Sequence, residues 1–389
     1  MDYISLMKYA PGNVLRGRLR FLLVLCFLLN SCTDPVTPEF EFQEGLIFIE
    51  GFASTVPGAS FVTINESALE FGVYVVNFVT GAEVRFENVV TGESILLTEV
   101  KGAYQAPQDF IVSPGERWKL NVLGANGQRY ESTPELALQP VPIANLEVDY
   151  DPELVFDVGR AEFIPGHAAK ISFNDPPERE NYYYWTYRTY ENLILCEKCV
   201  GGVFRDGACQ DIGNLSSGFP YFDYTCDTDC WRIRFPTSIS IFDDEFSNGK
   251  TTTNLKIGNL PLYNKEDMVV EVQQISLTSS AYEYYKVLKD IIDNNSGLNA
   301  PPPAALVGNL FNPNDSEDFV FGRFAVVATS TASAFIDRTT IAEEPLETRD
   351  PINHEPQIGC PFPPPCTSFA PCSETRFRTA IMPPGWIEQ

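Results

Sequence analysis

The stretch "VYVVNFVTGAEVRFENV", residues 73–89, decides the fold class of this chain. From Ala82 onward, apolar side chains occupy every second position and charged side chains fill most positions between them. A repeat of two places one face of an extended strand against a core and the other face in water, whereas a helix repeats every three or four residues. Thr80 and Gly81 separate the two halves and predict a turn. The stretch therefore predicts paired β-strands.

Similar short strands extend on both sides of this stretch. "LIFIEG" at residues 46–51 precedes it, and "SILLTEV" at 94–100 and "RWKLNVLG" at 117–124 follow it. Asn126-Gly127 is then a dipeptide typical of a tight hairpin. About seven strands with turns at this spacing predict an immunoglobulin-like β-sandwich over residues 45–139.

Residues 140–342 predict a second β-rich domain of the α+β type, so we expect a chain that is mainly β. "MVVEVQQISLT" at 268–278 predicts a strand that leads into one helix. Ser280 and Glu283 have the spacing of a capping box at its start, and Gly297 predicts its end. The apolar residues at helical spacing, which predict its buried face, are Tyr284, Val287, Leu288 and Ile291.

An aromatic run, "NYYYWTYRTY" at residues 181–190, supplies the candidate residues for contact with a ligand or partner. Alternation along a strand separates the rings onto two faces. Tyr182 and Tyr184 fall on one face, and Tyr183, Trp185 and Tyr187 fall on the other. Such rings could stack on a carbohydrate, but aromatic side chains in a strand more often belong to a core. The sequence leaves both interpretations open.

Cysteines gather in two places, an insertion at residues 195–231 and a Pro-rich tail at residues 343–389. The insertion opens with a C-x-x-C formed by Cys196 and Cys199. In a reducing compartment this density suggests a zinc knuckle, and in an oxidising compartment it suggests disulfides. The destination of the chain therefore decides between the two.

The N-terminus predicts export and lipid attachment. Residues 1–31 combine basic residues with a short apolar run and are typical of a signal peptide, because ten apolar residues are too few to span a bilayer as a helix. The run ends in "LNSC", which resembles a bacterial lipobox, a motif in which the cysteine, here Cys32, becomes the acylated first residue. Residues 32–44 are rich in proline and acids and predict an extended tether. An ordinary signal peptide with an incidental cysteine is the alternative.

Export would place the remaining cysteines in an oxidising space, so we expect disulfides and no metal site. The eight disulfide candidates are Cys196, Cys199, Cys209, Cys226, Cys230, Cys360, Cys366 and Cys372. Five lie in the insertion and three in the tail, so complete pairing requires at least one bridge between the two clusters. The sequence does not give the connectivity.

Charge and motifs argue against several functions. The chain carries 27 basic and 52 acidic residues, a formal net charge of −25, which repels phosphate backbones and argues against nucleic-acid binding. The sequence contains no phosphate-binding loop or nucleophile elbow, and its two histidines, His167 and His354, lie in no motif. We therefore expect no catalytic residues and no cofactor. "NPNDSED" at 312–318 offers oxygen ligands but lacks the spacing of a calcium loop, which favours a solvated turn.

Three motifs in the second half of the chain resemble those of the domain of unknown function 4249 family. They are the run from Gln274 to Tyr284, the triplet Gly308-Asn309-Leu310, and "VFGRF" at residues 320–324. The resemblance implies an outer-membrane lipoprotein of the Bacteroidota, encoded beside TonB-dependent receptors. It also implies a tail that is clamped back by disulfides.

By this resemblance we expect a non-enzymatic accessory subunit that binds or captures substrate for a TonB-dependent barrel. The lipid at Cys32 would hold it in the outer membrane, facing the cell surface. The aromatic run and the cysteine-rich insertion are the expected contact surfaces. A structural, assembly or adhesion subunit of an outer-membrane complex is the alternative, and a carboxylate-based hydrolase is a third possibility.

Overall fold

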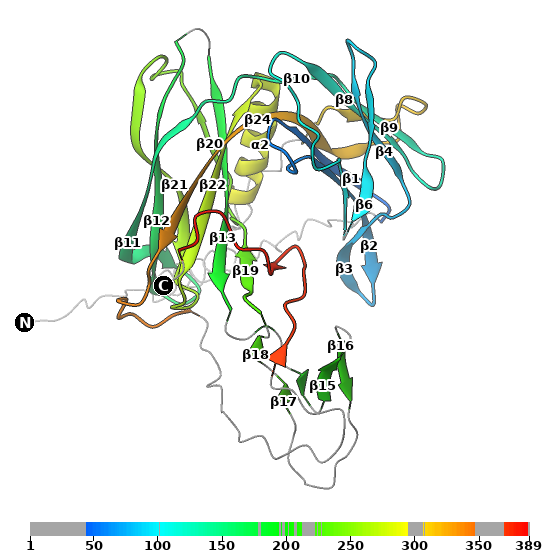
Figure 1. Ribbon diagram of the computed structural model, residues 1–389. Helices are drawn as coiled ribbons and strands as arrows, with labels where there is room; N and C mark the ends of the chain where they lie inside the picture. Colours follow the sequence, from blue (N-terminus) through cyan, green and yellow to red (C-terminus); the bar gives the residue numbers. More distant parts are fainter. Residues whose placement is uncertain are drawn as a thin grey trace, which may run out of the picture. The chain divides into compact units, whose positions relative to one another are not determined.

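The described part of the chain is mainly β (Figure 1). The computed structural model describes Cys196, Leu306 and residues 44–100, 102–177, 180–193, 199–200, 202–205, 208–211, 222–223, 225–226, 228–294, 308–346 and 369–387. The predicted signal peptide, Cys32 and nearly all of the tether lie outside these residues, as do Gly297, His354, Cys360 and Cys366. Among the described residues, no helix has both the length and the apolar character needed to cross a bilayer.

Two sheets enclose a first core. One is part of an eleven-stranded sheet and runs in the order β24, β1, β2, β7, β6, with β3 also paired to β2, and the other runs β23, β9, β8, β4, β5, with β10 on β8. The strands are β1 (Ile47–Ser54), β2 (Phe61–Glu70), β3 (Val73–Phe78), β4 (Glu83–Asn88), β5 (Ser94–Leu96), β6 (Thr98–Val100), β7 (Ala103–Gln105), β8 (Arg117–Leu123), β9 (Arg129–Ser132), β10 (Glu135–Leu136), β23 (Leu310–Phe311) and β24 (Val320–Ile336). Because β23 and β24 come from the C-terminal half, residues 45–139 do not complete these sheets alone.

The predicted alternation is confirmed in β4. Val84 and Phe86 are buried in the first core, while Glu83 is exposed and Arg85 is half-buried. Asn126-Gly127 lies in the turn between β8 and β9, where the Gly124 N–H donates to the Gln128 carbonyl at 2.8 Å. The immunoglobulin-like topology stays a prediction, since β24 pairs in parallel with β1 and brings Phe324 into the same core.

The rest of the eleven-stranded sheet and a three-stranded sheet enclose a second core. The eleven-stranded sheet contributes β26, β19, β13, β22 and β24, with β20 paired to β13, and the three-stranded sheet contains β11, β12 and β21. The strands are β11 (Ile143–Asp157), β12 (Glu162–Asn174), β13 (Tyr182–Asn192), β19 (Trp231–Arg234), β20 (Ser240–Asp243), β21 (Thr251–Pro261), β22 (Met268–Leu277) and β26 (Arg378–Thr379). Aromatic and branched side chains from both sheets meet in this core, Phe173 and Val270 among them.

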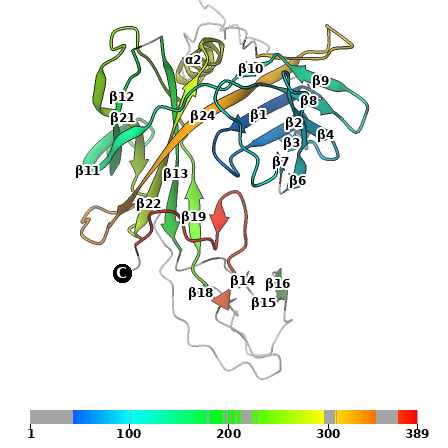
Figure 2. The same cartoon turned by 45° about the horizontal axis from the view of Figure 1, so that its top comes forward.

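Strand β24 belongs to the sheets of both cores (Figure 2). Its first half, from Val320 to Val327, pairs in parallel with β1, and its second half, from Ala328 to Ile336, pairs antiparallel with β22. Residues from Glu44 onward accordingly form one compact unit. One sheet therefore continues through both cores, and the predicted domain boundary between residues 139 and 140 stays a prediction.

Helix α2 (Ser279–Asn294) packs against β13, β20 and β22. Its start differs from the predicted capping box, because the Ala281 N–H donates to the Thr278 side chain at 3.3 Å, which makes Thr278 the N-cap. The predicted face, from Tyr284 to Ile291, is only half-buried. The deepest side chains are instead Ala281, Tyr282 and Tyr285, because two of them stack on tyrosines of β13.

The described residues of the insertion, and the first of those in the tail, form short strands. They are β14 (Cys199–Val200), β15 (Gly202–Arg205), β16 (Ala208–Asp211), β17 (Phe222–Asp223), β18 (Thr225–Cys226) and β25 (Phe369–Ala370). The tail returns to the body, since β25 pairs with β18 and β26 pairs with β19. Trp386 also packs edge-on against Trp231, with ring centroids 5.6 Å apart.

Candidate functional site

Three disulfides hold the insertion and the tail. The pairs are Cys196–Cys226, Cys199–Cys209 and Cys230–Cys372. The expectation of disulfides is supported for these six cysteines, and the third pair is the bridge between the two clusters that the odd numbers required. The two cysteines of the C-x-x-C thus bond to different partners and not to each other.

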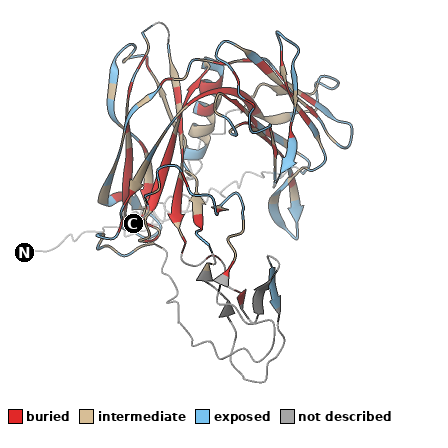
Figure 3. Ribbon diagram, viewed as in Figure 1, coloured by how far each residue is buried: buried red, intermediate tan, exposed pale blue. Residues whose placement is uncertain are grey.

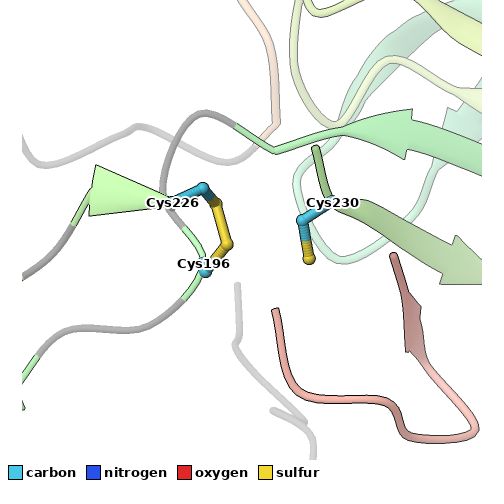
Figure 4. Close-up of side chains that lie close together, drawn as sticks. All are labelled: Cys196, Cys226 and Cys230. Atoms are coloured by element: carbon cyan, nitrogen blue, oxygen red, sulfur yellow. A yellow bond between two sulfur atoms is a disulfide. The ribbon is translucent and has the colours of Figure 1, made fainter. Parts of the chain in front are cut away.

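Two of the disulfides, Cys196–Cys226 and Cys230–Cys372, lie next to each other. The sulfurs of Cys196, Cys226 and Cys230 all lie within 4.8 Å of one another. Figure 4 shows the Cys230 sulfur beside the Cys196–Cys226 bond. Leu193 and Ala370 pack against this group. The described part of the insertion therefore has sulfur atoms where a larger domain would have an apolar core.

The oxidation state determines what this sulfur cluster can do. Zinc binds thiolates, and a sulfur in a disulfide has no thiolate to offer. Since Cys196 and Cys226 bond to each other and Cys230 bonds to Cys372, this arrangement is a covalent clamp. A reduced Cys230 thiolate would lie close enough to attack the neighbouring disulfide, which is the route of disulfide exchange.

The aromatic run of β13 is covered on both faces in this structure. Tyr183, Trp185 and Tyr187 are buried in the second core. On the other face, Tyr182 stacks on Tyr282 of α2 with ring centroids 4.8 Å apart. The remaining ring, Tyr184, stacks on Tyr285 at 5.0 Å, with the two rings inclined by only 7°. All five candidate contact residues therefore pack against protein side chains, Tyr183, Trp185 and Tyr187 buried and Tyr182 and Tyr184 half-buried, and a contact of this run with a ligand or partner stays a prediction.

A buried polar group accompanies the aromatic run. The Tyr183 hydroxyl donates to the Asp175 carboxylate, and the Gly249 N–H donates to the same carboxylate at 2.9 Å. Burial raises the pKa of Asp175, and it raises the pKa of the Tyr183 phenol as well. The hydrogen bonds satisfy an acid that would otherwise be costly to bury, so we assign it a structural role.

An ionic network closes the opposite end of β13. The Glu191 carboxylate accepts hydrogen bonds from Arg338 at 3.3 Å, Arg234 at 2.9 Å and Asn264 at 2.9 Å. Arg338 is completely buried, and burial lowers its pKa while Glu191 opposes that shift. Arg338 follows the end of β24, so the network fixes that end to β13 and β19.

Of the two histidines, His167 lies within the described residues and His354 lies outside them. His167 is buried on β12, edge-on to Tyr150 with ring centroids 5.3 Å apart. Burial and the positive charge of Arg338 lower the pKa of His167 to about 4. A neutral imidazole enclosed in this way has no access to a substrate.

The motifs that carry the family resemblance make hydrogen bonds between distant segments of the fold. Gln274 is completely buried, and it accepts a hydrogen bond from the Trp185 indole at 3.0 Å while donating to the Val141 carbonyl at 2.8 Å. Asn309 pairs with the backbone of Phe324 at 2.9 and 3.0 Å. These side chains satisfy buried backbone and indole groups, so the motifs identify a fold and not a chemistry.

Two glycines of these motifs permit a close approach of the backbones. A Cβ on Gly308 would lie 1.7 Å from the Gly322 carbonyl oxygen, and a Cβ on Gly322 would lie 1.9 Å from the Ile49 carbonyl oxygen. Gly322 also has a φ of +103°, which other residues rarely adopt. Gly322 therefore allows β24 to lie against β1, and Gly308 allows the segment before β23 to lie against β24.

The predicted solvated turn at residues 312–318 contains local hydrogen bonds. The Asn312 amide donates to Asp318 at 2.7 Å, and the Glu317 N–H donates to Asp315 at 2.9 Å. The Asn312–Asp318 bond joins two side chains of the same segment, which is typical of a turn stabilised by local hydrogen bonds.

The sequence did not single out the tip of the β2–β3 hairpin. Large apolar side chains on this hairpin are exposed, and Figure 3 draws much of it in pale blue. The signal was present in the "VYVV" run at residues 73–76, where four consecutive apolar residues break the alternation that a half-buried strand would show.

The comparisons with known proteins bear on family only. A family model described as a domain of unknown function (DUF4249) matches residues 33–333. This range covers most of the chain, including the three resemblance motifs, all of the first core and most of the second. No curated protein matches the chain.

Proposed function

The chain belongs to the DUF4249 family, and from that premise we propose that it is a lipid-anchored surface protein of the outer membrane that binds a TonB-dependent barrel. In this role it acts by binding and helps to capture or pass on the substrate of the barrel. The proposal is for a non-enzymatic subunit, in line with what the family resemblance implies.

The observation that carries this proposal is the "LNSC" motif ending at Cys32. Acyl chains on that cysteine would hold the protein at a membrane, since each buried CH₂ contributes about 0.8 kcal/mol. The three disulfides support an exported chain, because such bonds persist in oxidising compartments. The cysteine-rich insertion supports a binding role, since cross-linked loops lose little entropy when they dock.

The anchor is tested by replacing its cysteine. Cys32→Ala should leave the chain unprocessed or release it from the membrane fraction, and it should abolish labelling by a radioactive or clickable palmitate analogue. The matched control is Cys26→Ala, which lies within the apolar run of the predicted signal peptide and should label normally. A Cys32→Ala chain that still labels and fractionates with membranes would contradict the proposal.

The partner is tested by purification from native membranes. The tagged, acylated chain should bring down a β-barrel receptor as its main companion, and the Cys32→Ala chain should not. Deleting residues 201–206 from the insertion should weaken this association while the disulfide-bonded chain remains folded. Turnover of glycans or peptides by the purified protein would favour the hydrolase alternative instead.

A further inference from the structure

The β2–β3 hairpin carries apolar side chains on both of its faces. Beyond Ser67, which is buried, the outer part of the hairpin is half-buried or exposed. The large apolar residues exposed there are Leu69, Phe71, Val73, Tyr74 and Val76. Isolated exposed apolar residues are normal on a protein surface, but a contiguous group on a projecting hairpin marks an interaction site.

The turn of this hairpin holds its aromatic residue in an unfavourable backbone conformation. Glu70 pairs with Val73, so the loop consists of Phe71 and Gly72 alone, with φ of 51° and 81°. Two-residue turns of this kind prefer Asn, Asp or Gly at the first position, because a bulky side chain is strained at positive φ. The Phe71 side chain is fully exposed, so no burial within the fold compensates for this strain.

The chain enters the fold beside this hairpin. β1 and β2 are antiparallel, with Ile47 opposite Glu66, and the Gly45 N–H donates to the Ser67 carbonyl at 2.8 Å. Residues that precede Gly45 therefore join the fold at the end of β2 that leads to the turn. Cys32 lies twelve residues before Glu44, and that length of chain reaches at most about 40 Å.

We propose that the β2–β3 hairpin is a second membrane contact, which inserts its tip into the surface of the bilayer that holds the lipid anchor. Phe71 enters the acyl region and Tyr74 lies at the interface, the depth that aromatic side chains with one polar end prefer. The inference rests on the proposed anchor at Cys32, because that anchor puts the bilayer within reach of this end of the fold.

The chemistry of the hairpin favours lipid over a protein groove. Apolar side chains on both faces suit a medium that surrounds the tip, whereas a groove on a protein covers one face of a strand pair. The only charged side chain at the tip is Glu70, which accepts a hydrogen bond from Asn77 at 2.7 Å. Because the chain carries a net charge of −25, the contact should prefer zwitterionic lipid and weaken on anionic lipid.

The test uses the full acylated chain reconstituted into phosphatidylcholine vesicles with brominated acyl chains, which quench tryptophan at short range. Phe71→Trp places a probe at the tip, and Phe246→Trp is the matched control, because Phe246 is also strongly exposed but lies in the loop after β20. We expect the Phe71→Trp emission to shift to shorter wavelength and to be quenched at least about twofold more than the control. Adding phosphatidylglycerol should reduce the difference.

Flotation of the same vesicles separates this inference from the proposed function. A chain that floats with the vesicles while both probes are quenched equally would overturn the hairpin contact and leave the anchor standing. A chain that does not float would overturn the anchor and the hairpin contact together, since the tip alone is too small for lasting attachment.

A second variant separates lipid contact from misfolding. Phe71→Asn suits a left-handed turn, so the urea midpoint should be unchanged or higher. In a Tyr74→Trp background it should nevertheless lower the quenching by brominated lipid at least about twofold, whereas Phe246→Asn should leave it unchanged. If Phe71→Asn leaves the lipid quenching intact but abolishes recovery of a barrel or of a second copy of the chain, the hairpin is a protein contact and the proposal is wrong.

Discussion

The second core and the cysteine-rich insertion reach stability by different means. Strands of about ten residues, such as β13 and β22, bury whole rows of aromatic and branched side chains in the second core. The described strands of the insertion have two to four residues, and its interior consists of bonded cysteines with Leu193 and Ala370. A strand too short to bury a row of side chains needs a covalent bond to hold it.

The energies of the two solutions are similar. Full burial of one large apolar side chain contributes about 2 to 3 kcal/mol, and one disulfide contributes about 2 to 4 kcal/mol by restricting the unfolded chain. A few bonds can thus replace a small core. The two regions should then respond to different perturbations, the insertion and tail to reduction and the second core to the loss of a buried partner.

The largest expected effect is the loss of the bridge from the body to the tail. Cys230→Ser with Cys372→Ser opens a loop of 142 residues, and loop entropy predicts a loss of about 5 kcal/mol in the free energy of unfolding. Cys199→Ser with Cys209→Ser opens a loop of 10 residues and should cost about 2 kcal/mol less. Urea unfolding of the oxidised proteins measures both. Equal costs would break the comparison, because they would show that loop length does not matter here.

The single variant Cys372→Ser adds a chemical test of the sulfur cluster. It leaves Cys230 without its partner beside the Cys196–Cys226 bond. In a Cys360→Ser, Cys366→Ser background we expect peptide mapping to find the free thiol distributed over Cys196, Cys226 and Cys230, since exchange between adjacent sulfurs is rapid. A thiol confined to Cys230 would contradict exchange.

A smaller loss in the free energy of unfolding is expected for a variant of the second-core region. Glu191→Gln removes the carboxylate that Arg338 and Arg234 share, and an uncompensated buried cation costs about 3 to 4 kcal/mol. Glu83→Gln is the control, because its ion pair with Arg85 is exposed and such pairs contribute little. Unfolding in urea, with and without reductant, measures the change. If the loss caused by Glu191→Gln disappeared under reductant, the second core would depend on the disulfides, and the two regions would not be independent.

The smallest effect is a pH dependence of the free energy of unfolding, which arises in the second-core region. The pKa of His167 is about 4 in the fold and about 6.5 in the unfolded chain. Between these values only the unfolded state binds the proton, so stability is greatest above pH 6.5 and falls as the pH drops toward 4, by about 2 to 3 kcal/mol. His167→Gln should remove this part of the slope. The Cys199→Ser, Cys209→Ser chain should keep it, since the titration does not involve the insertion.

Local chemistry could be predicted from the sequence, and pairing between distant segments could not. The alternation in β4 and the turn at Asn126-Gly127 depend on neighbouring residues, and both predictions are confirmed. The odd numbers of cysteines correctly required a bridge between insertion and tail. Which sulfur meets which depends on the tertiary fold, so the partners of Cys196 and Cys199 could not be predicted.

Three features depend on contacts that the local sequence does not specify. Thr278, Ser279 and Ser280 are adjacent residues that can each cap a helix, and only the path of β22 into α2 selects Thr278. The rings of β13 alternate as predicted, but a second layer covers each face, which alternation within one strand cannot reveal. The exposed tip at Phe71 is likewise a property of how far β2 and β3 extend beyond their neighbours.

Strand β24 also constrains the order in which the molecule can fold. Ile47 begins a strand whose parallel neighbour begins at Val320, so the pairing must wait until nearly the whole chain is present. Contacts this distant in sequence slow folding. Until β24 arrives, β1 has an unpaired edge and the first core lacks Phe324 and Val326, and such edges invite aggregation. A chain emerging from a translocation channel with its N-terminus first would therefore need a holding chaperone until its last long strand appeared.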